Sequence, residues 1–334
     1  SLFQYRDFRA GGFYWTPDTK EIRVSIFGLF QKKVNKTTIQ LSSRLERLSV
    51  VPETSFLSTS NLDESKIRKR DFTVLTGSAG LFRSWDNLDV SFATMIAGRA
   101  PDLDELYSDG PHLGTYSYEI GQPDLDLERT IGIEGSVDYS MRKGQIKLTG
   151  YYNYSPNYHI STALGNTYEP GADWIEWGSG SSGWLYKYQM KGLEAQIYGW
   201  ESDIILPINK TINLVGSTSV VRGKNLSQGR DLEYMPPDKI QLLTEFNFKP
   251  LDVGLNMKKV FPQTRLGEFE TRTKGFSLLD LHASYTMHSS EMTHKLVVQL
   301  DNVFNEVYYN HLSRIKSIMP EEERCLSIQY RLIF

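Results

Sequence analysis

Hydrophobic and polar residues alternate along most of this chain with the two-residue period of a β-strand. The last ten residues separate almost completely into two faces, with Ile333 as the exception. The apolar face holds Leu326, Ile328, Tyr330, Leu332 and Phe334, and the polar face holds Cys325, Ser327, Gln329 and Arg331. Similar segments recur near the length that crosses a bilayer as a strand, so the pattern favours a transmembrane β-barrel.

Short and long connections between these segments alternate over the last two-thirds of the chain. The short turns lie at Met141–Gly144, Leu206–Lys210, Lys249–Leu251 and Met287–Ser290. The long connections run over Ser155–Trp184, Arg222–Lys239, Phe261–Lys274 and Phe304–Arg324. This asymmetry is typical of outer-membrane barrels, which have short periplasmic turns and long extracellular loops.

The first third of the chain is less regular but shows no helical period. The strands expected there are Phe8–Trp15, Ile22–Phe30, Thr38–Leu48, Phe72–Trp85 and Leu88–Ala97, with a polar gap at Ser55–Arg70. Together the segments predict an all-β fold, a transmembrane antiparallel β-barrel with about 14 strands in this chain.

The composition agrees with barrel strands and excludes other classes. The chain is 40% hydrophobic with a mean hydropathy of -0.39, and it contains no apolar run of the roughly 20 residues that a spanning helix needs. Nineteen Tyr, sixteen Phe and six Trp suit interfacial aromatic girdles, although a β-sandwich core uses aromatic residues as well. A net charge of -3 argues against a nucleic-acid partner. The single cysteine, Cys325, excludes an internal disulfide.

Three segments carry a family resemblance. They are Arg99–Tyr107 (RAPDLDELY) leading to Gly110–His112, then Glu119–Glu128 (EIGQPDLDLE), and Leu300–Tyr309 (LDNVFNEVYY). In this order, and with the strand pattern, they resemble the barrel of TonB-dependent outer-membrane receptors. In that family an aromatic C-terminal strand serves as the signal for membrane assembly, which the resemblance places here on Tyr330, Leu332 and Phe334. The segment Met319–Arg324 departs from the family's Pro-Gly-Arg element and keeps only a Pro and an Arg.

The resemblance implies a larger protein than this chain. Family members combine an N-terminal plug with a barrel of about 22 strands, and 334 residues are too few for both. We therefore expect residues 1–334 to form one barrel domain, the C-terminal part of a receptor, without a plug domain. The chain opens on no leader-like segment, which indicates a mature form or a fragment. A truncated product that closes a smaller barrel by itself is the other interpretation.

Candidate binding residues lie mainly in the expected extracellular loops. His112, His159, Asp104 and Glu105 combine imidazole and carboxylate groups, which bind transition metals, but such groups also serve as solvated loop residues or packing anchors. Trp174 and Trp177 lie mid-loop, where they can stack on a flat ligand or pack within the loop. Trp184, Tyr186 and Tyr188 fit better in the outer aromatic girdle. No histidine spacing matches a metal motif, and neither a metal site nor a cofactor is assigned.

The predicted function is active import across the outer membrane. The resemblance implies a receptor for an iron-siderophore, haem, zinc or a similar ligand, powered by the TonB energy-coupling complex through a plug outside this chain. The expected partners are outer-membrane lipid, this complex and a small-molecule or metal-chelate ligand. No Gly-x-Ser-x-Gly elbow or base-and-orienter set predicts an enzyme. Two alternatives stay open: a passive pore of about 14 strands, and a soluble β-sandwich binding protein.

Overall fold

The computed structural model describes residues 1–9, 16–53, 61–165, 175–180 and 183–334. These form one mainly antiparallel sheet with short helical turns in its connections. The strands are β1 Leu2–Phe8, β2 Thr19–Val34, β3 Thr37–Pro52, β4 Arg70–Ser84, β5 Leu88–Arg99, β6 Asp109–His112, β7 Ser117–Ile120, β8 Glu128–Ser140, β9 Gln145–Ala163, β10 Trp177–Gly180, β11 Gly183–Pro207, β12 Ile212–Asn225, β13 Arg230–Asp231, β14 Lys239–Phe248, β15 Leu251–Val260, β16 Phe276–His288, β17 Thr293–Asp301 and β18 Cys325–Ile333. The helical segments are α1 Leu103–Tyr107, η1 Glu64–Lys66 and η2 Leu113–Thr115.

The long strands follow one another as a meander in which each pairs antiparallel with the next. The order is β1, β2, β3, β4, β5, β8, β9, β11, β12, β14, β15, β16, β17 and β18. Four short strands, β6, β7, β10 and β13, belong to the long connections. Fourteen long strands therefore build the wall, as the alternation predicts, and the β-sandwich alternative is wrong because the strands form a single continuous sheet.

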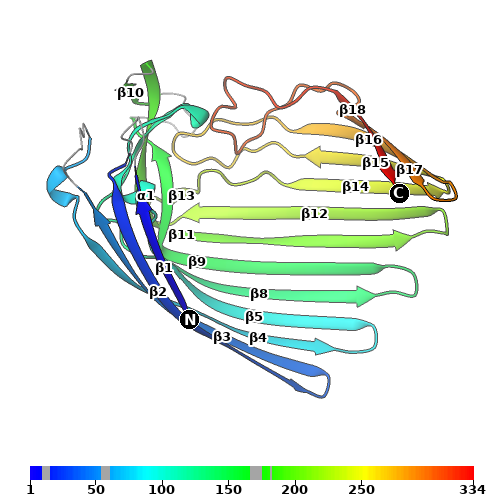
Figure 1. Ribbon diagram of the computed structural model, residues 1–334, viewed down its shortest axis with the longest axis horizontal. Helices are drawn as coiled ribbons and strands as arrows, with labels where there is room; N and C mark the ends of the chain where they lie inside the picture. The colour runs from blue at the N-terminus through cyan, green and yellow to red at the C-terminus, as the bar shows by residue number, and fades with distance from the viewer. Residues whose placement is uncertain (10–15, 54–60, 166–174, 181–182) are drawn as a thin grey trace.

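The sheet curves into an open trough with all its short turns along one edge (Figure 1). The long connections lie at the opposite edge, and the C-terminus lies at the short-turn edge. β1 and β18 are the two ends of the wall, and no pairing between them is present among the described strands. The structure thus has the architecture of part of a barrel wall, which agrees with the expected partial barrel.

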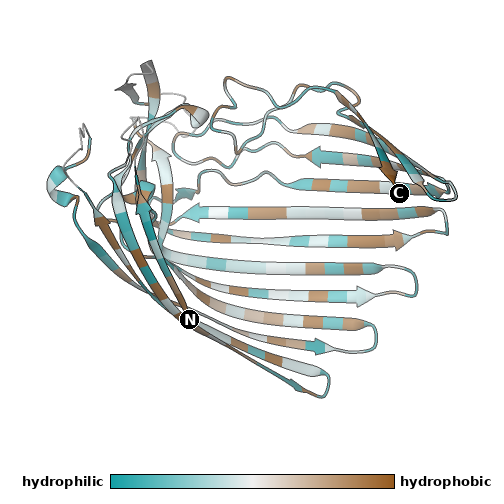
Figure 2. Cartoon of the chain, in the orientation of Figure 1, coloured by the Kyte–Doolittle hydropathy of each residue, from teal (hydrophilic) through white to brown (hydrophobic). Residues whose placement is uncertain are grey.

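Register gives each long strand one apolar and one polar face, which appear as alternating bands of hydropathy in Figure 2. On the outer face of the last strands, Leu281 pairs with Leu300, which pairs with Leu326. On the inner face, His282 pairs with Gln299, which pairs with Ser327. Large apolar side chains on the outer face are exposed, and such a continuous belt is uncommon on a soluble monomer.

The packed cores all lie towards the edge with the long connections. The largest cluster packs α1 and its flanking loop onto the inner face of β3 and β4. Its buried members are Leu48, Val50, Ile67, Phe72, Val74, Ala100, Leu106, Tyr107 and Leu125. A loop that buries Leu106 and Tyr107 completely has a fixed position relative to the wall.

Several sequence expectations need correction in detail. The first strand is Leu2–Phe8, not Phe8–Trp15, and residues 10–15 lie outside the described residues. Helical turns occur although no helical period is visible, because α1 is only five residues long. The connection expected over Ser155–Trp184 is shorter, since β9 continues to Ala163 and β11 begins at Gly183. No helix in the described part of the chain is both long and apolar enough to cross a membrane.

Candidate functional site

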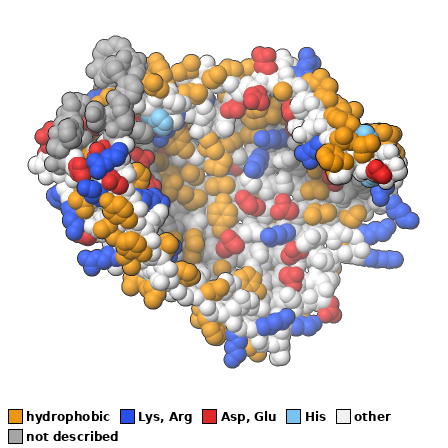
Figure 3. Space-filling view, viewed as in Figure 1, with side chains coloured by type: hydrophobic (Ala, Val, Ile, Leu, Met, Phe, Trp, Pro, Cys, Tyr) orange, Lys and Arg blue, Asp and Glu red, His pale blue; other side chains and the backbone are white. Residues whose placement is uncertain are grey.

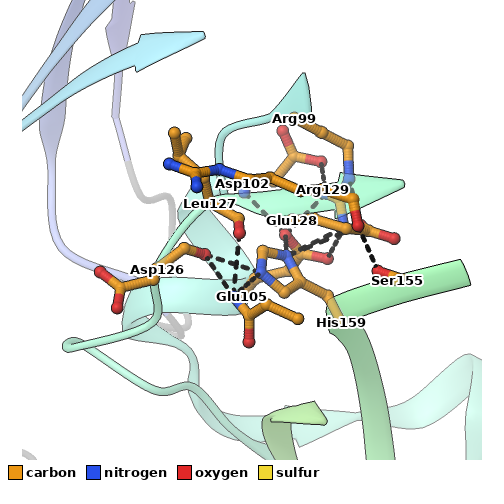
Figure 4. A network of polar contacts seen from close by, with 10 residues as sticks. Arg99, Asp102, Glu105, Asp126, Leu127, Glu128, Arg129, Ser155 and His159 are labelled. Atoms are coloured by element: carbon orange, nitrogen blue, oxygen red, sulfur yellow. Dashed lines mark hydrogen bonds and ion pairs between the residues drawn. The ribbon is translucent and has the colours of Figure 1, made fainter. Parts of the chain in front are cut away.

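A partly buried polar network holds α1 against the wall (Figure 4). The Arg99 guanidinium, at the end of β5, donates to Glu105 at 2.7 and 2.9 Å and to Glu128 at 2.7 and 2.9 Å. Its Nη2 lies 3.1 Å from Nδ1 of His159, and Nε2 of His159 lies 2.8 Å from the Asp126 carbonyl oxygen. Nδ1 of His159 also lies 3.6 Å from Glu105 Oε2.

The network fixes the charge of Glu105. Burial by itself raises the pKa of this carboxyl group, but hydrogen bonds from His159, Arg99 and the Asp102 backbone N–H outweigh burial and lower the pKa to about 2. The Asp102 N–H lies 2.9 Å from Glu105, so the same carboxylate also caps the first turn of α1. The polar side chains of Arg99, Glu105, Glu128 and His159 contact one another and hold the α1 loop in place. We call these four residues the α1 clamp.

A cavity of about 200 Å³ lies where the long connections meet above the trough. It is lined by Ile175, Tyr186, Tyr188, Tyr234, Phe269, Glu270, Thr271, His311, Ser313, Arg314, Lys316 and Ser317. One side of the cavity is formed by Tyr186 and Tyr188 near the start of β11. The other sides come from the connections β9–β10, β13–β14, β15–β16 and β17–β18.

Arg314 is the central cation of this cavity. Its guanidinium lies 4.7 Å from the ring centre of Tyr188 and 5.7 Å from that of Tyr234. It also donates to Glu119 Oε1 at 3.0 Å, and the same oxygen lies 3.1 Å from Nδ1 of His112. The last long connection is thereby tied to the loop between β5 and β8.

Two residues of the last connection, His311 and Lys316, hold it to the β15–β16 connection. The His311 ring is fully buried, with Nε2 3.2 Å from Glu270 and Nδ1 2.9 Å from the Thr273 hydroxyl. Lys316 donates to the Thr271 carbonyl oxygen at 2.7 Å. Burial acts to raise the pKa of Glu270, but its bonds from His311 and from backbone N–H groups lower it overall. Glu270 is therefore a charged residue of the cavity wall, and its carboxylate is held by His311 and by backbone N–H groups.

The comparisons with known proteins agree with this architecture. A sequence model of the TonB dependent receptor-like β-barrel matches residues 2–305. The chain belongs to the TonB-dependent receptor family. Among solved structures of similar fold, the copper transporter OprC superposes with a TM-score of 0.74 at 21% identity, covering 93% of this chain and 47% of OprC.

Two further similar structures have lower identity. The FrpB iron transporter from Neisseria meningitidis has a TM-score of 0.65 at 13% identity, with 94% of this chain and 46% of FrpB covered. The siderophore receptor PirA from Acinetobacter baumannii has a TM-score of 0.60 at 12% identity, with 94% and 54% covered. At these identities the likeness concerns the fold, and the chain spans about half the length of each protein.

The structure places the residues singled out in this receptor chain at three different locations. Glu105 and His159 meet in the α1 clamp, and Asp104 is exposed on α1. His112 contacts Glu119 beside the cavity. Trp177 packs 4.0 Å, centre to centre, from Tyr186, which lines the cavity. Trp174 lies outside the described residues. No group of three or more His, Cys, Asp or Glu side chains suited to a metal ion occurs in the described part of the chain.

Most of the cavity lining was not identified from the sequence. Tyr186 and Tyr188 line the cavity and do not belong to the outer girdle, and the side chain of Trp184 is not described. Arg314 and Glu119 are 195 positions apart, so no local pattern reveals their contact. One signal was available: Ser313–Ser317 places two cations in a connection that otherwise carries a run of Glu residues.

Proposed function

We propose that this chain forms part of the wall and the extracellular ligand site of an outer-membrane receptor that imports a scarce small molecule with energy from the TonB complex. Its family membership supports this function. The exposed apolar outer face and the polar inner face are those of a wall with lipid on one side and water on the other. The loops packed over one end of the trough are placed to capture a ligand before it enters.

The lining of the cavity suggests the ligand class. Arg314 over Tyr188 and Tyr234 offers a cation between aromatic faces, and Lys316 adds a second positive charge. Such a lining binds a flat group that carries negative charge, through charge-assisted hydrogen bonds and ring contacts. Its two cations outnumber the one lining carboxylate, Glu270, which is already in contact with His311, so the lining favours an organic chelate over a bare metal cation. We infer an anionic aromatic metal chelate, such as a ferric catecholate siderophore.

The size of the cavity limits what it encloses. Its volume is about 200 Å³, smaller than the roughly 300–1,000 Å³ that encloses a drug-sized ligand. It therefore holds one aromatic arm of a chelate, with the rest of the ligand above it near Trp177 and Tyr186. This arrangement gives the predicted ligand residue Trp177 a contact at the cavity mouth.

Binding to purified protein tests the ligand class. Arg314→Gln should weaken binding of ferric tris-catecholate about 10- to 100-fold, since a hydrogen bond to a charged group is worth roughly 1.5–3 kcal/mol. Arg272→Gln, an exposed cation of the neighbouring connection that does not line the cavity, is the matched control and should bind as the parent does. Equal losses in both variants, or tighter binding of free Zn²⁺ or haemin than of the catecholate, would refute this assignment.

Uptake by cells separates the receptor from the pore. The complete receptor gene should support iron uptake from the same chelate only in cells that contain TonB, while binding to cells stays unchanged without it. Uptake that proceeds equally well without TonB would instead support the passive pore. Arg314→Gln in the complete receptor should reduce uptake at low chelate concentration and recover at high concentration.

A further inference from the structure

Positive charge gathers at the edge of the wall that carries the short turns, which we call the turn edge. The turn edge comprises the six connections 35–36, 85–87, 141–144, 208–211, 249–250 and 289–292 together with Lys32 and Lys33 at the end of β2. Its connections contain the cations Lys36, Arg142, Lys143, Lys210 and Lys249, and the acids Asp86 and Glu291. The strand ends within three residues of these connections add five cations (Lys32, Lys33, Arg83, Lys147 and Lys295) and three acids (Asp89, Asp138 and Asp252), so cations remain in excess. The whole chain has a net charge of -3, so this excess of cations is local. Figure 3 shows Lys and Arg side chains along the same edge.

These cations are exposed and largely unpaired. Among the described residues of the turn edge, the one ion pair joins Lys36 to Asp86 at 2.9 Å. The opposite edge differs, because many of its cations are neutralised by neighbours, for example in the pairs Lys20–Glu53, Arg222–Asp238 and Arg230–Glu268. The turn edge therefore offers free positive charge to a partner.

Apolar and aromatic side chains lie directly beside these charges. Trp85 and Ile208 are exposed within the short turns, and Phe30, Tyr139 and Phe248 are exposed on the strands near them. The Arg83 guanidinium lies 5.0 Å from the Trp85 ring centre, which keeps this cation at the same level as the aromatic ring. An apolar band bordered by a row of cations matches a molecule with acyl chains and a negatively charged headgroup.

We propose that the turn edge binds the anionic headgroups of phospholipids in the leaflet next to it, which rests on the proposed placement of the strands in a bilayer. An acidic protein would match the charges but not the adjoining apolar band. Each Lys or Arg close to an anionic membrane surface raises affinity about fivefold. Several such contacts select phosphatidylglycerol over phosphatidylcholine. The attraction weakens at high salt, because the exposed charges are screened within roughly 10 Å at 0.1 M.

Trp85 provides a reporter at the turn edge. The purified chain is reconstituted into vesicles of phosphatidylcholine alone or of an equal mixture with phosphatidylglycerol, with one lipid brominated at a time. Subtracting the signal of Trp85→Phe isolates quenching at this residue. Brominated phosphatidylglycerol should quench Trp85 more strongly than brominated phosphatidylcholine, and the difference should shrink with added salt.

Two sixfold variants locate the effect. The turn-edge variant carries Lys→Gln or Arg→Gln at Lys32, Lys33, Arg142, Lys143, Lys210 and Lys249. The control variant carries the same changes at six exposed cations of the opposite edge, Arg47, Arg129, Lys259, Arg272, Lys274 and Arg324. The turn-edge variant should lose the preference for phosphatidylglycerol by at least about tenfold. The control variant should keep it.

The outcomes separate this proposal from the proposed function. Heat-modifiable gel migration and incorporation into vesicles report insertion in every variant. Inserted protein that is quenched equally by both lipids, or that loses its preference only in the control variant, overturns the lipid site and leaves the receptor assignment standing. Failure of the parent chain to enter vesicles of either composition counts against the placement in a bilayer, and with it against this site.

Discussion

Glu233 provides a direct test of how tightly the loops pack above the trough. Its carboxylate accepts a hydrogen bond from the Thr162 hydroxyl at 2.6 Å. Gly267 lies so close that a Cβ on it would come within 2.0 Å of the Glu233 Cγ. Burial is the main cause that raises the pKa of Glu233, with a contribution from Glu270, and the bond from Thr162 opposes it. The resulting pKa is about 7, compared with an ordinary value of 4.5.

The raised pKa makes folding dependent on pH with a defined sign. Between pH 4.5 and about 7 the folded protein holds a proton at Glu233 that the unfolded chain has released. Stability from this group is therefore complete below pH 4.5 and is lost as the pH rises through about 7. The difference corresponds to roughly 3 kcal/mol at pH 8. This value is an upper limit, since the Gly267 loop can shift and admit water.

Glu233→Gln keeps the size and an acceptor for Thr162 but removes the charge. We expect the variant to be more stable than the parent at pH 8 by up to about 3 kcal/mol, with the advantage vanishing near pH 4. Thermal unfolding in neutral detergent, followed by intrinsic fluorescence at several pH values, measures this. Glu323→Gln, at an exposed position, is the control and should give no pH-dependent difference. An unchanged stability of Glu233→Gln at pH 8, or one equally raised at pH 4, would show that Glu233 is solvated and the loops are open.

Two substitutions test the clamp that holds α1. Glu105→Gln should lower the free energy of unfolding by about 2 kcal/mol. This loss is smaller than that for breaking a fully buried ion pair, because Glu128 still pairs with Arg99 and the Arg99 side chain is 41% exposed. Asp126→Asn, at a 91% exposed carboxylate in the same loop, should change the unfolding free energy by less than about 0.5 kcal/mol. Gly121→Ala should lower the free energy of unfolding by about 1–3 kcal/mol, because its Cβ would lie 2.6 Å from the Leu106 backbone carbon. Gly114→Ala is the control. Its Cβ would lie 3.8 Å from the nearest atom, so this change should be neutral. Urea unfolding of each pair compares these values, and equal effects within a pair would contradict the close packing of α1.

The wall was predictable from the sequence because its signal is local. A strand repeats every two residues, so Leu326, Ile328 and Tyr330 identify a face without knowledge of their neighbours. The turn at Met141–Gly144 likewise shows where one strand ends and the next begins. The strand count follows from these local signals.

The cavity was not predictable because its contacts join distant segments. Thr162 and Glu233 are 71 positions apart, and Arg314 reaches Glu119 across 195 positions. Imidazole and carboxylate groups in loops suggest a metal site from residue type alone. In the structure, His159 and Glu105 are instead occupied by Arg99, which no spacing rule connects to them.

The length of the strands explains where the cavity and the α1 clamp lie relative to the wall. A strand crosses a bilayer with about 9–11 residues, whereas β9 has 19 and β11 has 25. With the strands in a bilayer as proposed, the additional residues extend the wall beyond it. His159 and Tyr188 then lie on paired strands, each beyond the part needed for crossing. Phe269, Glu270 and Arg314 come from connections without such pairing. One side of the cavity is therefore fixed by the sheet. On the proposed function, release of a bound ligand arm would require movement of the loop side alone. The ties from His311 and Lys316 to the β15–β16 connection join the two loops that have to move, so they should move as one unit.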